Sequence, residues 1–291
     1  MSDPTCIPYP DAAVLETRPE SQLPAAAETR AAPAQYATAD RLKARLELHQ
    51  RFGDEAEEFH AWQFRQVQAP LDAQVLEVGC GTGALWQVNR ARVPHRWVLT
   101  LSDLSEGMLS EARHNLRHSG LNVVFNRHGV QQLPYGDDSF DVVFANHMLY
   151  HVTDVPQALS EIRRVLRPGG RLYAATNGEH HMGEARELLT LLNGMVPESR
   201  GPEIDISPFS METGAELLEE HFDDVRLFER RDQLVVTEVE PLVQYVLSIA
   251  APFEAPADGW GPVDRWRRAV EDRFQGGVYS IKRVSGFFEA L

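Results

Sequence analysis

Glu77 stands two residues before the first of three alternate glycines in the stretch "VLEVGCGTG", which runs from Val75 to Gly83. Glycines that follow a buried strand leave backbone N–H groups accessible, because no side chain keeps a ligand away. Asp103 follows about 20 residues later, the offset expected for a carboxylate that accepts ribose hydroxyls. These residue types and spacings predict a site for a ligand that contains a nucleoside.

Two classes of cofactor fit this pattern. Gly79, Gly81 and Ala84 satisfy the G-x-G-x-x-G/A pattern of dinucleotide-binding proteins. A dinucleotide brings a pyrophosphate, however, and a carboxylate at Glu77 would not help to bind it. S-adenosylmethionine has a ribose, no phosphate and a cationic amino-acid end that Glu77 can meet. The residues therefore favour S-adenosylmethionine, and an NAD(P)-dependent oxidoreductase stays a distant alternative.

The elements that must position these residues alternate along the chain. After Pro70, strand-like runs alternate with helical patterns as far as "RLYAAT", and the runs are apolar nearly throughout. Strands covered by helices on both faces have this composition, so the pattern predicts an α/β fold with a doubly wound parallel sheet. The closing segment "GGVYSIKRVSGFFEAL" is expected to form a strand or a hairpin.

Composition and periodicity also divide the chain. The first segment is rich in Pro and Ala and has few large apolar side chains, which predicts disorder. Everything after it is expected to form a single domain at 37–291. The expected parts are a disordered tail at 1–36, an N-terminal helical lid at 37–70, a cofactor-binding half at 71–177, and substrate-cap insertions at 178–212 and 240–275.

Four blocks in this order resemble the class I S-adenosylmethionine-dependent methyltransferases. They are "VLEVGCGTG", "LSDLSEGMLSEAR", "LPYGDDSFDVVFANHMLYHV" and "EIRRVLRPGGRLY". The resemblance covers roughly Gln74 to Ala175. It implies a Rossmann-like sheet of seven strands with the last strand antiparallel, S-adenosylmethionine as cofactor and S-adenosylhomocysteine as product. It also implies an enzyme of the small-molecule type.

Carried over residue by residue, the resemblance implies a set of cofactor contacts. Asp103 takes the ribose diol, and the carbonyl of Asn146 faces the methionine part. The residues around the methionine part are Glu77, Gly79, Cys80, Gly81 and Gly83.

The adenine subsite contains one departure from the family pattern. Leu104 and Met108 are implied to pack on the adenine ring, and the N–H of Val130 is implied to meet its edge. The family commonly has Asp immediately before that position, whereas this chain has Gly129. The adenine amino group therefore lacks a carboxylate partner here, and Gln131 or water is the expected substitute.

Methyl transfer from a sulfonium is a one-step displacement that needs alignment and, for a poor nucleophile, removal of a proton. Candidate bases follow the fourth predicted strand, where ligands of such sheets bind; they are His147, Tyr150 and His151. The candidate substrate contacts are Tyr36, Tyr150, His180 and His181. No metal site is predicted, because His147 and His151 have no clear third ligand beside them.

Composition and charge narrow the partners. The chain has 291 residues, with 43 acids against 28 bases and a formal charge of −15. A nucleic-acid partner normally requires a basic surface, so neither nucleic acid nor an anionic membrane is expected. Two cysteines and the lack of a charged-then-apolar leader predict a cytoplasmic protein, monomeric or homodimeric.

The resulting hypothesis is a methyltransferase that acts on an O or N atom of a small molecule, neutral or cationic, such as a specialised metabolite. The alternative is a methyltransferase acting on a protein or RNA. The acidic balance argues against RNA, and the fourth strand ends in "ANHM" instead of an amino-methylation motif such as "NPPY".

Overall fold

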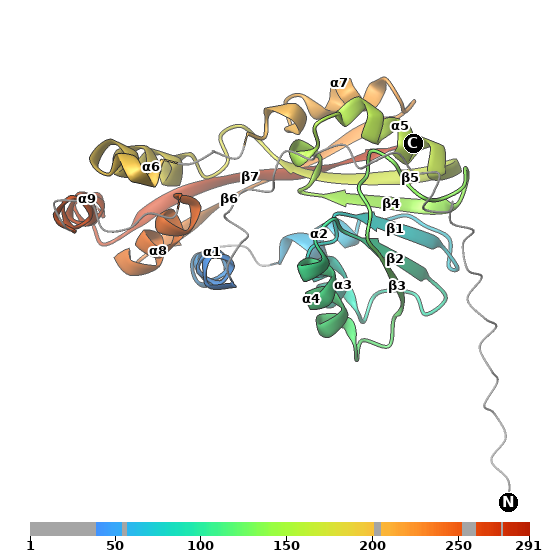
Figure 1. The fold of residues 1–291 in the computed structure, drawn as a ribbon, viewed down its shortest axis with the longest axis horizontal. Helices are drawn as coiled ribbons and strands as arrows, with labels where there is room; N and C mark the ends of the chain where they lie inside the picture. The colour runs from blue at the N-terminus through green and yellow to red at the C-terminus, as the bar shows by residue number, and fades with distance from the viewer. Residues whose placement is uncertain (1–38, 54–56, 201–204, 252–259, 275) are drawn as a thin grey trace, which may run out of the picture.

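The computed structural model of the chain describes residues 39–53, 57–200, 205–251, 260–274 and 276–291. These form a seven-stranded sheet with the order β3-β2-β1-β4-β5-β7-β6 (Figure 1). Strands β1 to β5 pair in parallel, whereas β7 is antiparallel to both of its neighbours. The predicted seven-stranded sheet with an antiparallel last strand is confirmed. The strands are β1 (Gln74–Val78), β2 (Val98–Ser102), β3 (Asn122–Asn126), β4 (Phe140–Asn146), β5 (Leu166–Asn177), β6 (Val225–Val236) and β7 (Tyr279–Ala290).

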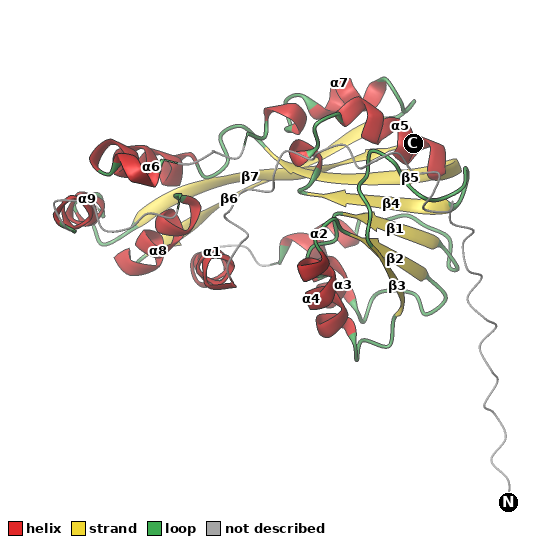
Figure 2. Ribbon diagram, viewed as in Figure 1, coloured by secondary structure: helices red, strands yellow, loops and turns green. Residues whose placement is uncertain are grey.

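Helices cover both faces of the sheet, as Figure 2 shows. Side chains alternate along each strand, so Val75 and Val142 join one core while Leu76 and Val143 join the other. The first core is covered by α2 (Phe59–Phe64), α3 (Ala84–Asn89) and α4 (Glu106–Leu116). The second is covered by α5 (Val155–Val165) and α7 (Gly214–Glu219). Short 3-10 helices are η3 (Leu149–His151), η4 (Pro197–Ser199) and η5 (Ser207–Phe209).

The strand order reverses between β1 and β4, because β1 lies between β2 and β4. In open α/β sheets, ligands bind at the carboxyl ends of the strands beside such a reversal. Glu77, Asp103 and Asn146 lie at the carboxyl ends of β1, β2 and β4. We call this the carboxyl edge of the sheet.

Strands β6 and β7 continue beyond the rest of the sheet. They pair over twelve residues, from Val225 opposite Ala290 to Val236 opposite Tyr279. The pairing of β5 with β7 ends at Asn177 opposite Ser285. The remaining part of β7 therefore projects past the carboxyl edge, paired with β6 alone.

A second group of helices packs around this projection (Figure 1). Leu234, Val236 and Ile281 from the two strands are fully buried there among helix side chains. We call this group, together with the projecting ends of β6 and β7, the outer cluster. Its helices are α1 (Ala39–Phe52), α6 (Gly183–Met195), α8 (Val239–Ile249) and α9 (Gly261–Glu271). We call residues 71–177, which contain the methyltransferase-like motifs, the motif half.

The closing segment forms the single strand β7, one of the two forms expected for it, and pairs antiparallel with β6, which ends about 40 residues earlier in the chain. The helical segment expected at 37–70 forms two helices that separate: α1 packs against α8 in the outer cluster, and α2 packs against α3 in the motif half. The proposed tail at 1–36 lies outside the described residues. In the described part of the chain, no helix is long and apolar enough to cross a membrane.

Candidate functional site

Glu77 is a buried carboxylate held by an indole. Its side chain is 3% exposed, and Trp86 Nε1–H donates to its Oε2 over 2.6 Å. Burial raises the pKa of Glu77 to about 7, although the Trp86 hydrogen bond, His60 and the Asn146 side chain oppose the rise. Burial disfavours the charged form, so a cationic group placed nearby would restore the carboxylate.

The three glycines that follow β1 have different surroundings. All three have positive φ angles, of 66°, 53° and 76°, which favour glycine. A Cβ at Gly79 would lie 2.9 Å from Met148, and one at Gly83 would lie 3.1 Å from Leu116. A Cβ at Gly81 would have no described atom within 4 Å. Two of the glycines therefore allow side chains to pack closely, and Gly81 is the one that faces open space.

Asp103 ties the glycine turn to the end of β2. Its Oδ2 accepts from the Gly81 N–H at 3.0 Å, and its Oδ1 accepts from the Ser105 N–H at 2.8 Å. A carboxylate has about four lone-pair sites, so two of them remain for other donors. Asp103 can thus position the backbone of Gly81 and still accept two hydroxyl groups.

The residues expected around adenine lie at the ends of β2 and β3. Leu104 is 39% exposed, and a Cβ at Gly129 would lie 3.5 Å from its side chain. Val130 is buried and Met108 half-buried. The Met108 N–H donates to Ser105 Oγ at 3.3 Å, so Ser105 is the N-cap of α4. An exposed leucine beside a residue with no side chain leaves an apolar surface for a flat ring.

The end of β4 carries the candidate bases. His147 has a φ of 52°, an uncommon value for a residue other than glycine, and its ring centroid lies 5.3 Å from that of Phe59 on α2. Burial lowers its pKa to about 4, with a smaller contribution from His60. Tyr150 and His151 follow on η3 with their ring centroids 4.5 Å apart, and burial lowers the pKa of His151.

The two histidines after β5 have different environments. His180 is exposed. His181 accepts the Val284 N–H of β7 on its Nδ1 at 3.2 Å, and its pKa is lowered to about 3 by burial first and then by His49 and His147. His181 therefore joins the end of β5 to the projecting part of β7.

The remaining predicted site residues are Cys80 and Tyr36. Cys80 is buried, its N–H donates to the Ser102 carbonyl at 2.9 Å, and burial raises the pKa of its thiol. It packs in the core below the turn. Tyr36 lies outside the described residues. Within those residues, no group of three or more His, Cys, Asp or Glu side chains could hold a metal ion.

Two contacts at the carboxyl edge were not predicted from the sequence. Trp86, nine residues after Glu77, is the hydrogen-bond donor to its carboxylate. Gln63 of α2 is fully buried, and its Nε2–H donates to Asn146 Oδ1 at 2.8 Å. The available signal was a lone amide among the aromatic and apolar residues of "FHAWQF". Its partner, 83 residues away, could not be read from the spacing.

The residues present fit the expected cofactor in kind. Glu77 suits a cationic amino-acid end, Asp103 has acceptor sites left for a diol, and Gly81 gives access to the main chain. Gln63 Oε1 is buried and has no hydrogen-bond partner among the described residues, so the edge still offers an unused acceptor.

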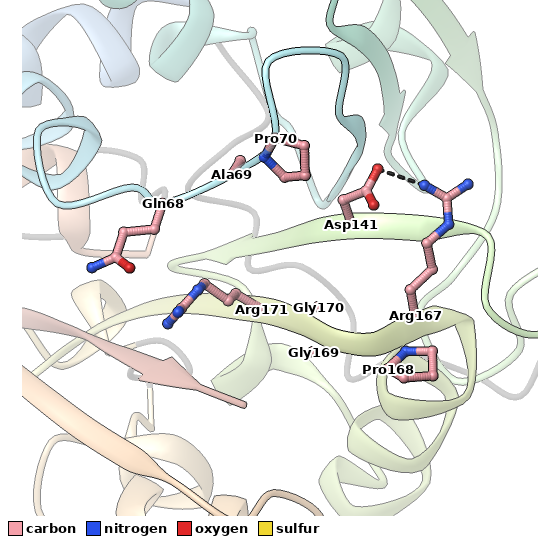
Figure 3. Close-up of a pocket in the computed structure, with 9 residues that line it drawn as sticks. All are labelled: Gln68, Ala69, Pro70, Asp141, Arg167, Pro168, Gly169, Gly170 and Arg171. Atoms are coloured by element: carbon pink, nitrogen blue, oxygen red, sulfur yellow. Dashed lines mark hydrogen bonds and ion pairs between the residues drawn. The ribbon is translucent and has the colours of Figure 1, made fainter.

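A cavity of about 350 Å³ lies at the opposite edge of the sheet, where β4 and β5 begin (Figure 3). Its charged side chains are Asp141, Arg167 and Arg171. Asp141 accepts from Arg167 at 2.6 Å, and Arg171 donates to Glu289 at 2.9 Å. Since its charges are already paired and none of the predicted cofactor or substrate contacts lines it, we place the functional site at the carboxyl edge instead.

Residues 76–174 match a family model described as "Methyltransferase domain". The motif half is a class I methyltransferase domain. The match starts inside β1 and ends inside β5, so it contains Glu77, Asp103 and Asn146.

Curated relatives of this methyltransferase domain match over the same part of the chain. A ubiquinone/menaquinone biosynthesis C-methyltransferase from Vibrio vulnificus is 39% identical over 101 residues, which span 34% of this chain and 39% of that protein. A malonyl-[acyl-carrier protein] O-methyltransferase from Erwinia pyrifoliae is 35% identical over 127 residues, which span 44% of this chain and 46% of that protein. The matches therefore cover less than half of either relative.

Solved structures extend the likeness to most of the fold. The crystal structure of a candidate methyltransferase from Bacillus halodurans C-125 is 16% identical, with a TM-score of 0.54. The alignment covers 80% of this chain and 97% of that one. At this level of identity the likeness concerns the fold, and it does not extend to substrate or partners.

Proposed function

We propose that this chain is an S-adenosylmethionine-dependent methyltransferase that transfers a methyl group to an O or N atom of a small molecule. The observation that carries the proposal is the arrangement at the carboxyl edge. There a buried Glu77 held by Trp86 stands beside Gly81, which faces open space and is fixed by Asp103. A cationic nucleoside matches both carboxylates, whereas a pyrophosphate would be repelled by them.

In this proposal the two carboxylates bind opposite ends of the cofactor's ribosyl-methionine part. Glu77 binds the amino-acid end, Asp103 accepts the ribose hydroxyls, and the open backbone at Gly81 lies between them. The adenine ring packs on Leu104 and Met108, and Val130 supplies its N–H to the ring edge. A Cβ at Gly129 would lie 3.5 Å from Leu104, so glycine at this position leaves the Leu104 side chain open to the ring.

His147 is the proposed proton acceptor. When bound, S-adenosylmethionine supplies a methyl group that its sulfonium has already activated. Because burial lowers the pKa of His147 to about 4, its imidazole is neutral at pH 7 and can accept a hydrogen bond from an acceptor O–H or N–H as the methyl group is transferred. It directly follows Asn146, at the end of the strand beside β1. His151 and Tyr150 lie one turn further along and are proposed to contact the substrate.

The outer cluster is the proposed substrate cap. It is built on the part of β6 and β7 that projects past the carboxyl edge, and His181 joins it to the end of β5. His180 is exposed beside that junction, where a substrate can reach it. A helical cap over one edge suits a small substrate that must be sheltered from water more than it suits a macromolecule.

Calorimetry with S-adenosylhomocysteine and with NAD tests the cofactor. We expect binding of the first in the micromolar range and none of the second; the reverse result would reassign the chain to the oxidoreductases. Radiolabelled S-adenosylmethionine with fractions of a small-molecule extract, followed by mass analysis, then tests the acceptor. Transfer of label to protein or RNA alone would contradict a small-molecule substrate.

His147→Asn tests the proton acceptor once a substrate is known. General bases contribute about 100-fold to 10,000-fold, so kcat should fall by at least 100-fold while the affinity for S-adenosylhomocysteine stays within twofold. His151→Asn is the matched control, and we expect it to raise KM more than it lowers kcat. If His151→Asn lowers kcat by at least 100-fold and His147→Asn mainly raises KM, the base is His151.

A further inference from the structure

Gln63 and Asn146 form a buried pair of amides with unused hydrogen-bonding atoms. The Nε2–H of Gln63 donates to Asn146 Oδ1 at 2.8 Å. Within the described residues, Gln63 Oε1 and Asn146 Nδ2 have no partner within 3.5 Å, although Nδ2 lies near enough to Glu77 to favour its ionised carboxylate. Buried polar atoms are nearly always paired, because leaving one unpaired forfeits its hydration without return. A ligand that bonds to these two atoms would account for their burial.

The pair lies beside the proposed cofactor site. Asn146 ends β4, and its side chain is close enough to Glu77 to oppose the rise of that carboxyl's pKa. Gln63 reaches the same place from α2, which packs against α3 just after the glycine turn. Two neighbouring amides and one carboxylate therefore surround a single point of the carboxyl edge.

The unused atoms are one acceptor and one donor. Rotating both amides by half a turn exchanges the atoms, but it still leaves one donor and one acceptor free. An α-amino acid group carries an ammonium donor and a carboxylate acceptor on the same carbon. It is the chemical group that satisfies both amides at once and also faces Glu77.

We propose that Gln63 is a further cofactor-binding residue, which accepts a hydrogen bond from the α-ammonium of the methionine end while Asn146 Nδ2 donates to the α-carboxylate. The inference rests on the proposed use of S-adenosylmethionine and extends it to α2. None of the motifs includes Gln63, which precedes the first of them by more than ten residues.

The neighbours of Gln63 connect this contact with the substrate side. Trp62 packs on Phe287 of β7 with ring centroids 5.2 Å apart, and Phe59 lies 5.3 Å from His147. Binding of the amino-acid end to Gln63 thus fixes the same short helix that contacts the proposed base. The six-residue α2 positions both the cofactor and His147.

Two ligands that differ only in the amino-acid end provide the test. S-adenosylhomocysteine contains it, and methylthioadenosine keeps the adenine, ribose and thioether without it. Both are titrated by calorimetry into the full chain, its Gln63→Met and Gln63→Leu variants, and a Gln66→Leu control. The two substitutions at Gln63 keep an apolar chain of similar volume, and melting temperatures identify any variant that fails to fold.

Loss of Gln63 should weaken S-adenosylhomocysteine about tenfold and leave methylthioadenosine within twofold, and Gln66→Leu should change neither. An equal loss for both ligands would make Gln63 a packing residue and overturn the inference. Unchanged binding of both would overturn it as well. If the unsubstituted chain binds methylthioadenosine and S-adenosylhomocysteine equally, the inference fails while a nucleoside site survives; if it binds neither, the proposed function fails with it.

Discussion

The motif half and the outer cluster each bury one tryptophan completely, and the two indoles have different tasks. In the motif half, Trp86 donates its N–H to the carboxylate of Glu77 at 2.6 Å. In the outer cluster, Trp266 of α9 donates to the backbone carbonyl of Leu188 on α6 at 2.9 Å. The first indole positions a titratable group at the ligand edge. The second connects two helices.

This difference indicates how the two regions divide the work. Packing in the motif half ends at the carboxyl edge, where buried side chains hold the groups proposed to bind the cofactor. Packing in the outer cluster joins helices to the projecting strands and forms a separate hydrophobic core. Damage to the outer cluster should therefore reduce stability and substrate turnover, whereas damage at the edge should reduce cofactor affinity.

The largest expected effect comes from Trp266→Ala. Removing a fully buried tryptophan leaves a cavity and costs about 3–5 kcal/mol in the free energy of unfolding. Denaturant unfolding measures this loss, and calorimetry below the transition should show S-adenosylhomocysteine affinity within about twofold of the unsubstituted chain. Trp260→Ala, at an exposed tryptophan before α9, is the control and should cost far less. If folded Trp266→Ala no longer binds the nucleoside, cofactor binding in the motif half depends on the packing of the outer cluster.

The next effect concerns Asp103. Replacing it by Ala removes the acceptor for the Gly81 and Ser105 N–H groups together with the proposed acceptor for the ribose, so affinity for S-adenosylhomocysteine should fall about 100-fold. Asp154→Ala is matched to it, since Asp154 also accepts a backbone N–H, from Gln157 at 3.0 Å, but it caps α5 and is not among the proposed cofactor contacts. We expect that control to lower stability by about 1 kcal/mol with no change in affinity. Similar affinity losses in both variants would contradict the ribose assignment.

A smaller effect should appear in the pH dependence of binding. The pKa of Glu77 is raised to about 7, and a cationic amino-acid end binds its ionised form. Affinity should therefore rise with pH and level off above 7, so that at pH 6 it is about tenfold weaker than at pH 8. Calorimetry across this range measures the curve. Glu77→Gln should bind more weakly and with no such dependence.

The Trp86–Glu77 hydrogen bond sharpens that test. It stabilises the ionised carboxylate, so Trp86→Phe should move the binding curve to higher pH. Stability without ligand should run in the opposite direction from affinity: the folded chain keeps the Glu77 proton up to about pH 7, whereas the unfolded chain loses it near 4.5. The free energy of unfolding should therefore fall as pH rises between these values. If the affinity of the unsubstituted chain, of Glu77→Gln and of Trp86→Phe does not change with pH, Glu77 is excluded from the ligand site.

The sequence predicted the motif half better than the outer cluster, for a physical reason. A glycine turn and a strand-end carboxylate are separated by a short, nearly fixed number of residues. The position of "VLEVGCGTG" therefore predicts the position of Asp103. The outer cluster depends on contacts such as Trp266 with Leu188, 78 residues apart, which no local pattern encodes. The same holds for Gln63 and Asn146, and for the separation of α1 from α2. The distinct surroundings of Gly79 and Gly81 also depend on Met148, a residue from another strand end.

The smallest expected effect lies at the amino edge of the sheet, in the cavity beside Arg167. Its ion pair with Asp141 is partly exposed, and such pairs contribute about 1 kcal/mol or less to stability. Asp141 also accepts the Gln74 N–H at 2.7 Å, so it keeps a partner when the arginine is removed. Arg167→Ala should therefore leave both S-adenosylhomocysteine affinity and methyl transfer within twofold, although Arg167 lines a cavity of about 350 Å³. A tenfold loss of either would mean that the two edges of the sheet are coupled through β4, which runs from Asp141 near one end to Asn146 at the other. Cofactor affinity would then depend on the whole strand and not on the carboxyl edge alone.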